Sequence, residues 1–212
     1  ETQREQFILV NKARGLPSRL INELLPEVSV LLPRDLSTRQ LPSALCAALN
    51  TDPQSPFHGI IRQESNARDK GGIVTDSALI EMMRRSLKSP SGALGQFRRE
   101  GDGADTAAMY ETMLLYWRAV RDVFPEAWGK PPTESRLMHS AGIRAMGALI
   151  DPMMLRADAE QDKEAAVRRS LTRLKPHCRW TEGRWEGLGL DWNDVQSTAQ
   201  HIARLSDHLL HL

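Results

Sequence analysis

The chain contains only two cysteines among its 212 residues, Cys46 and Cys178, and they lie far apart with no Cys-x-x-Cys spacing. This pattern argues against a disulfide framework and against a structural zinc site, and it fits a reducing compartment. No run of about 18 apolar residues and no signal-peptide pattern occurs. The sequence therefore predicts a cytoplasmic protein with no membrane partner.

The sequence also lacks an excess of charge of either sign, because 28 basic and 27 acidic residues leave a formal net charge of +1. Any nucleic-acid-binding surface would have to come from local segregation of charge. No Walker loop, no Gly-x-Gly-x-x-Gly and no Gly-x-Ser-x-Gly motif occurs. We therefore expect no catalytic residue and no self-contained catalytic motif in this chain.

Helical spacing dominates what is present, and 41% of the residues are hydrophobic. The strongest pattern covers 104–124, where Tyr110, Met113 and Trp117 recur at steps of three or four, so this helix should be central. Other helices are expected at 38–49, 76–87, 139–149 and 158–175 and after Trp192. A small β-hairpin is expected near 57–75, where two β-branched segments flank a polar, glycine-rich tract. The predicted fold class is mainly α-helical with one small β-hairpin.

Three local features in the second half of the chain refine this prediction. Asp151-Pro152 should bend or end the helix that contains His139, and the small residues 141–148 of that helix would allow close helix approach. The helix after Trp192 should bury one apolar face, either against the body of the domain or against a second subunit.

The opening segment contains one candidate phosphate-binding corner. Two short predicted helices meet at Gly15-Leu16-Pro17, with Lys12, Arg14 and Arg19 beside the corner. Backbone amides at the N-terminus of the second helix could receive an anion. A DNA-reading helix-turn-helix has this shape, but so do most short helical hairpins.

A second basic group lies in the middle of the chain. Arg84, Arg85 and Lys88 end one predicted helix, and Arg98 and Arg99 lie on a neighbouring segment. Together they could meet phosphates, although the Gly15-Leu16-Pro17 corner is the better phosphate candidate of the two. Cations at a helix C-terminus also complement the helix macrodipole, so both interpretations stay open.

Histidine and cysteine suggest little chemistry in this pattern. His208 and His211 could face the same way, but no third ligand at metal-site spacing accompanies them, so we expect no metal. His177 beside Cys178 is an equally weak nucleophile pair, because no orienting third group is evident, and we interpret Cys178 as structural.

Three tryptophans lie in the tail, at 180, 185 and 192, near Arg179 and Arg184. Such residues could stack on nucleic-acid bases. More often they lock a loop against a core, which is the interpretation we favour, since glycines 183, 187 and 189 mark turns.

Several stretches of the chain resemble the later part of DGQHR-domain proteins. They are residues 7–17 with 24–26, 55–61, 116–120 with 124–128, and the tail segments 177–185 and 191–196. The resemblance covers most of the chain. This family is similar to DndB, a protein associated with DNA phosphorothioation, and it belongs with ParB-like proteins.

The defining Asp-Gly-Gln-His-Arg box is absent from this chain, which also does not begin with Met. The resemblance therefore implies a ParB-like domain that precedes this segment, with residues 1–26 as its end and 27–212 as a helical domain. Asn11 and Arg14 resemble the Glu-Asn-x-x-Arg region close to the ligand site of ParB-like domains. The resemblance implies that these two residues lie near a nucleotide or nucleic acid.

The function that the resemblance implies is DNA binding or regulation within a bacterial DNA-modification system, phosphorothioation-like, or a defence system. DNA and other DNA-modification proteins are the expected partners, with self-association through the C-terminal helix. No cofactor is expected in this chain, and a nucleotide is left open for the intact protein. Two alternatives remain: a helical support domain of an ATP-hydrolysing or nuclease-like enzyme, whose activity would depend on the DGQHR region, and a protein-interaction scaffold.

Overall fold

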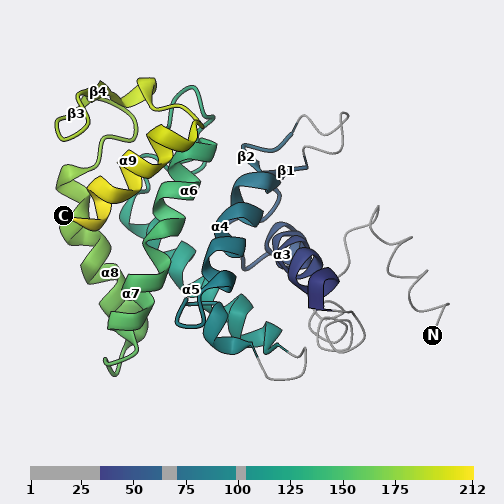
Figure 1. Cartoon of the computed structure of the whole chain (residues 1–212). Helices are drawn as coiled ribbons and strands as arrows, with labels where there is room; N and C mark the ends of the chain where they lie inside the picture. Colours follow the sequence, from purple (N-terminus) through teal and green to yellow (C-terminus); the bar gives the residue numbers. More distant parts are fainter. Residues whose placement is uncertain (1–33, 64–70, 99–103) are drawn as a thin grey trace.

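The computed structural model describes residues 34–63, 71–98 and 104–212, and within them the chain is mainly helical, as predicted (Figure 1). The predicted end of a ParB-like region, residues 1–26, lies outside the described residues. The α-helices are α3 (Arg34–Thr51), α4 (Asp76–Lys88), α5 (Thr106–Val123), α6 (Ser140–Ala148), α7 (Ile150–Ala157), α8 (Lys163–Leu174) and α9 (Ala199–Leu210). Short 3-10 helices are η2 (Gly95–Phe97), η3 (Lys175–His177) and η4 (Trp192–Asp194). The strands are β1 (Ile61–Arg62), β2 (Val74–Thr75), β3 (Arg184–Trp185) and β4 (Leu190–Asp191).

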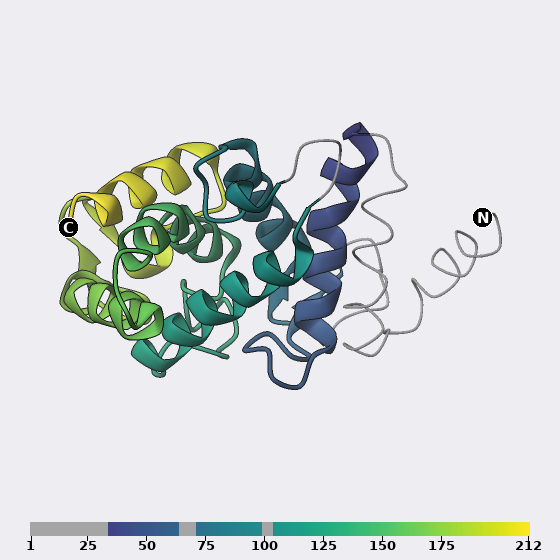
Figure 2. The same ribbon diagram turned by 90° about the horizontal axis from the view of Figure 1, so that it is seen from below.

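The helices form one packed body around a single hydrophobic core. Helix α3 packs on α4, α4 on α6 and α6 on α9, while α5 and α7 both pack on α8 (Figures 1 and 2). Helix α5 has the central position that its pattern predicts, because Met109, Met113 and Trp117 are completely buried. Among the described residues, no helix has the length and apolar character needed to cross a membrane.

Helices α4 and α6 run side by side in the same direction. The Oγ1 atom of Thr75, the N-cap residue of α4, lies 3.1 Å from the Oγ of Ser140, the first residue of α6. A Cβ atom added to Gly147 of α6 would lie 2.7 Å from the Cβ of Met82 on α4. The predicted close approach is therefore present, and it depends on Gly147.

The strand pair near 57–75 is present, but the prediction of a hairpin was wrong about its direction. Strands β1 and β2 pair in parallel, with Ile61 opposite Val74 and Arg62 opposite Thr75. In a parallel pair the chain has to return to the starting end of the first strand before the second strand begins, whereas in a hairpin a tight turn joins the two strands. The residue pattern of the two strands is the same in both cases, so it does not predict which connection occurs. Gly72 makes the return fit, because a Cβ there would lie 2.3 Å from the Arg62 nitrogen. The antiparallel pair is β3–β4, in the tryptophan-containing tail.

The second half of the chain contains the break that was predicted near Asp151-Pro152, at Leu149, but the residues after the break form a helix that was not predicted. Helix α6 ends at Ala148 and a separate helix, α7, begins at Ile150. Pro152 lies in the first turn of α7, where a residue without an N–H is tolerated. Helix α8 begins at Lys163 rather than near 158, because Asp162 caps it by accepting a hydrogen bond from the Ala165 N–H.

The apolar face of α9 is buried within the same chain. Ile202, Leu205 and Leu209 are all less than 8% exposed, and α9 packs on α6. Of the two alternatives for this helix, contact with the body of the domain is the one found.

Candidate nucleic-acid interface

The structure describes part of the predicted phosphate-binding set. Asn11, Lys12, Arg14, Arg19 and Arg99 lie outside the described residues. The other four predicted residues are Arg84, Arg85, Lys88 and Arg98, and the structure brings them to one end of α4.

Helix α4 separates its apolar and basic residues onto opposite faces. Leu79, Met83 and Leu87 are buried. Arg85 and Lys88 are exposed, and the Arg84 side chain is 42% exposed. Since positions 84, 85 and 88 recur at helical spacing, the three cations share one face at the C-terminal end of the helix.

Arg98 returns to the same end of α4 from the following segment. Its Nη1 lies 3.5 Å from the Leu87 carbonyl oxygen, to which it donates a long hydrogen bond. This carbonyl belongs to the last turn of α4, whose carbonyl groups have no partner within the helix. For Arg98, the structure therefore supports the interpretation that the cation complements a helix C-terminus, and its remaining guanidinium donors stay exposed.

A buried polar network holds the connecting loop, residues 89–97, against α4. Asp151 of α7 accepts hydrogen bonds from the Ser86 hydroxyl and, at 2.8 Å, from the Ala93 N–H. Ser86 Oγ in turn accepts the Leu94 N–H at 3.0 Å. A Cβ on Gly92 would lie 2.1 Å from the Ser86 carbonyl oxygen. This loop is therefore fixed tightly enough to position Arg98.

The structure adds Arg144 of α6, which the sequence analysis missed. Its Nη2 lies 3.6 Å from Glu81 Oε2, while Glu81 Oε1 lies 3.8 Å from Arg84 Nη1. We call Arg84, Arg85, Lys88, Arg98 and Arg144 the basic surface. The small residues of α6 were the available signal for this contact, because they predict the close helix approach that brings Arg144 to α4.

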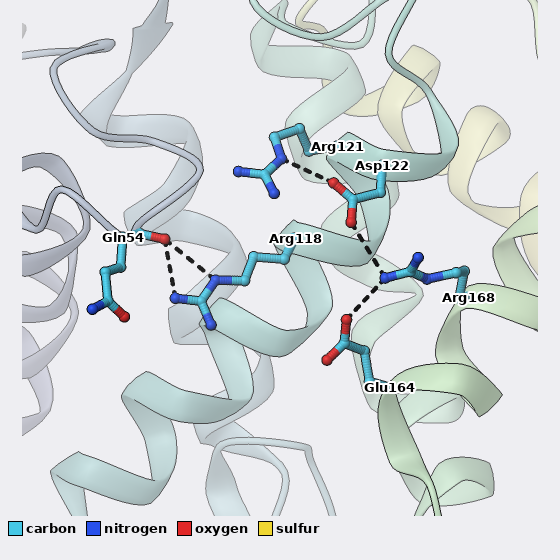
Figure 3. Close-up of polar contacts among 6 residues, drawn as sticks. All are labelled: Gln54, Arg118, Arg121, Asp122, Glu164 and Arg168. Carbon is cyan, nitrogen blue, oxygen red and sulfur yellow. Dashed lines mark hydrogen bonds and ion pairs between the residues drawn. The ribbon is translucent and has the colours of Figure 1, made fainter.

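In a second group of arginines, on α5 and α8, Arg121 and Arg168 pair with carboxylates, while Arg118 donates to a backbone carbonyl group (Figure 3). Arg118 donates to the Gln54 carbonyl oxygen from Nε at 3.3 Å and from Nη2 at 3.0 Å. Arg168 lies between Asp122, at 3.3 Å, and Glu164, at 2.9 Å. The Arg121 Nε donates to Asp122 Oδ1 at 3.0 Å.

The basic surface differs from this mixed surface in how its charges are compensated. In the part of the chain that the structure describes, no carboxylate lies within ion-pair distance of Arg85 or Lys88. Exposed cations without internal counter-charges keep more of their attraction for an external anion. The basic surface is therefore the better candidate for phosphate contacts.

Two of the three tail tryptophans, Trp180 and Trp185, anchor a loop in the core, as the favoured interpretation predicts, whereas Trp192 is half-buried. Trp180 and Trp185 are 4% and 1% exposed, and their rings meet edge to face with centroids 5.0 Å apart. Phe124 packs edge to face on Trp180 at 6.4 Å, and His208 packs on Trp185 at 6.1 Å. Buried rings of this kind are not available for stacking on bases.

The two thiols are poor nucleophiles in this structure. Burial is the main cause that raises the pKa of Cys46 and of Cys178 to about 12. Cys178 also donates to the Leu174 carbonyl oxygen at 3.5 Å, which suits the structural role predicted for it. No group of three histidine, cysteine or acidic side chains suited to a metal ion occurs among the residues that the structure describes.

Comparison with known proteins adds no relative to this picture: no family model, no curated protein and no solved structure matches the chain.

Proposed function

We propose that this chain is a DNA-binding or regulatory module, and that the basic surface contacts the phosphates of duplex DNA. The observation that carries the proposal is the convergence of five cations from α4, the following loop and α6, with Glu81 as the one acidic partner among the described ion pairs there. Phosphate contacts by such cations provide most of the affinity for DNA and make that affinity strongly dependent on salt.

We also propose, from the resemblance to DGQHR-domain proteins, that the module acts in a bacterial DNA-modification or defence system. Three aromatic residues in the stretches that carry this resemblance pack together in the core: the Phe57 ring lies 5.1 Å from that of Trp117 and 5.2 Å from that of Trp128. Both the shared framework and its DNA-binding role are part of the proposal.

A scaffold that self-associates through α9 is a weaker candidate. Because the apolar face of α9 already packs on α6, self-association through that face would have to expose Ile202, Leu205 and Leu209 first. Uncovering three buried aliphatic side chains costs several kcal/mol, on the order of 1.5–3 kcal/mol each.

The test measures DNA binding by the 1–212 chain, with the fluorescence anisotropy of a labelled duplex as the readout, across a series of salt concentrations. We compare the wild type with an Arg85→Ala, Lys88→Ala double variant. The matched control is a Lys130→Ala, Arg173→Ala double variant, which removes the same charge from two exposed residues away from the basic surface.

If Arg85 and Lys88 each contact one phosphate, the slope of log K against log salt should fall in magnitude by about 1.8 in the first variant. The control should keep the slope of the wild type. Absence of binding at low salt, or equal losses in the two double variants, would contradict the proposal.

A further inference from the structure

Glu81 lies within the basic surface, between two guanidinium groups that come from different helices. Its Oε1 is 3.8 Å from Arg84 Nη1 on α4, and its Oε2 is 3.6 Å from Arg144 Nη2 on α6. Both distances are longer than the usual N–H···O hydrogen bond of about 2.9 Å. Glu81 therefore compensates part of the positive charge without closing either ion pair into a hydrogen bond.

The buried packing beneath these residues fixes the two arginines relative to each other. Arg144 lies nearly one turn before Gly147, and Glu81 directly precedes Met82, the residue that Gly147 touches. The backbones of α4 and α6 thus meet directly under the charged side chains. Since these helices are held by core contacts, the two guanidinium groups are brought together before any ligand arrives.

The ion pairs themselves are weak enough to exchange with another anion. The side chains of Glu81, Arg84 and Arg144 are 51%, 42% and 33% exposed. Ion pairs this exposed contribute little to stability, because solvent screens them. Each guanidinium group carries five N–H donors and binds carboxylates and phosphates through the same fork geometry. Because Glu81 closes neither ion pair into a hydrogen bond, N–H donors of both guanidinium groups stay available to a phosphate oxygen beside the carboxylate.

We infer that Arg84 and Arg144 form a phosphate-binding pair for the DNA backbone, and that Glu81 is a built-in counter-charge that lowers the affinity of this pair. The inference rests on the proposed function. It adds a contact from α6 and assigns an opposing role to an acidic residue. A phosphate bound between the two arginines lies beside Glu81, and the two negative charges repel each other.

The first measurement compares Glu81→Gln with the wild type in the anisotropy assay with duplex DNA. Removing the repulsion between two unit charges about 4 Å apart in water corresponds to about a fivefold gain in affinity. Glu186→Gln is the matched control, because Glu186 is exposed in the β3–β4 turn, away from α4 (Figure 1). Both variants change the net charge by the same amount, so any gain in DNA affinity in the control comes from the net charge alone and not from a local contact.

The second measurement separates a phosphate contact from a purely structural ion pair. Arg144→Ala should weaken binding and reduce the magnitude of the salt slope by about 0.9, whereas Arg173→Ala, an exposed arginine on α8, should leave the slope unchanged. The loss should persist when Arg144→Ala is combined with Glu81→Gln. If Arg144 acted only by holding Glu81, the substitution would have no effect once the Glu81 charge is absent.

The outcomes distinguish this inference from the proposed function. Wild-type binding that depends on Arg85 and Lys88, together with Glu81→Gln and Arg144→Ala variants that match their controls, overturns the inference and keeps the function. Absence of duplex binding by the wild type and by Glu81→Gln overturns both. A selective gain from Glu81→Gln with a persistent loss from Arg144→Ala supports the inference.

Discussion

Removal of the Asp151 carboxylate should destabilise the domain through two buried donors that lose their acceptor. The Ser86 side chain is 1% exposed and Ala93 is 2% exposed, and both donate to Asp151 Oδ1. A buried donor left without a partner costs about 1–3 kcal/mol. Because the Ser86 hydroxyl can rotate and water can enter the space of the lost side chain, we expect Asp151→Ala to lower the free energy of unfolding by about 2–4 kcal/mol.

The matched variant is Asp151→Asn, which keeps an oxygen acceptor in the same position and loses only the charge. Hydrogen bonds to charged acceptors exceed neutral ones by about 1 kcal/mol each, and two donors are affected, so this variant should lose up to about 2 kcal/mol. Ser86→Ala and the Asp151→Ala, Ser86→Ala double variant complete a cycle, in which the two losses should be less than additive. Losses that are less than additive would show that Asp151 and Ser86 stabilise the domain as one coupled network.

The assay is urea unfolding followed by the fluorescence of the five tryptophans, with the unfolding midpoint and slope fitted for each variant. An Asp151→Ala loss below about 0.5 kcal/mol would show that water replaces the carboxylate at no cost, and that the buried-donor argument fails. An Asp151→Asn loss equal to that of Asp151→Ala would show that the charge matters rather than the acceptor geometry.

Four further predictions follow from individual contacts. Burial, and next Arg136, lowers the pKa of His139, whose Nδ1 accepts the Ala141 N–H at the start of α6. The stability from this cap should be complete above about pH 6.5 and decline as the pH falls below it. The free energy of unfolding should depend less on pH in His139→Asn than in the wild type, and an equal pH dependence would contradict this prediction. Gly142→Ala should lower the free energy of urea unfolding by more than about 2 kcal/mol, because the new Cβ would lie 1.9 Å from the Arg136 carbonyl oxygen. Gly71→Ala is the control and should be nearly neutral, because a Cβ there would have open space around it. Arg136→Lys should lower the free energy of unfolding by about 1 kcal/mol, because the guanidinium donates to the carbonyl oxygens of Asn193 and Pro132 from several nitrogens. A melting temperature equal to that of the wild type would refute this. Both thiols should react with an alkylating reagent at pH 8 only after unfolding, since their pKa values of about 12 leave little thiolate. Labelling is measured from the mass of the protein, and rapid labelling of the native protein would contradict this prediction.

Local patterns were sufficient to predict most of the helices, but not α7 and not the direction of strand pairing. Apolar spacing located α4 and α5 to within a few residues, because each helix buries one continuous stripe. The β1–β2 pair runs parallel, with Ile61 opposite Val74; the Asn50 side chain accepts the Ile61 N–H at 3.0 Å, and Gly72 lies too close to Arg62 for a Cβ atom. Those contacts join residues that are distant in sequence, and no two-residue periodicity encodes them.

The basic surface illustrates the same limit for a candidate site. Arg84, Arg85 and Lys88 could be grouped from the sequence because one helix carries them. Arg98 was assigned to a neighbouring segment, and its return to the α4 carboxyl end depends on the Asp151 network. Arg144 gave no charge pattern at all, since a single arginine on a helix of small residues looks like an ordinary solvated position.

The residues that resemble DGQHR-domain proteins and the residues that form the basic surface belong to different parts of the molecule. The first group includes Phe57, Trp117 and Trp180, which are at most 4% exposed, and a buried aromatic is constrained in size and shape by every neighbour that it touches. The second group lies at the surface, and under the proposed function each cation would contribute to DNA affinity through a screened charge that a nearby lysine or arginine can replace. A resemblance carried by core aromatics therefore identifies a framework more readily than a binding surface, and salt-dependent binding by defined charge variants is the measurement that connects the two.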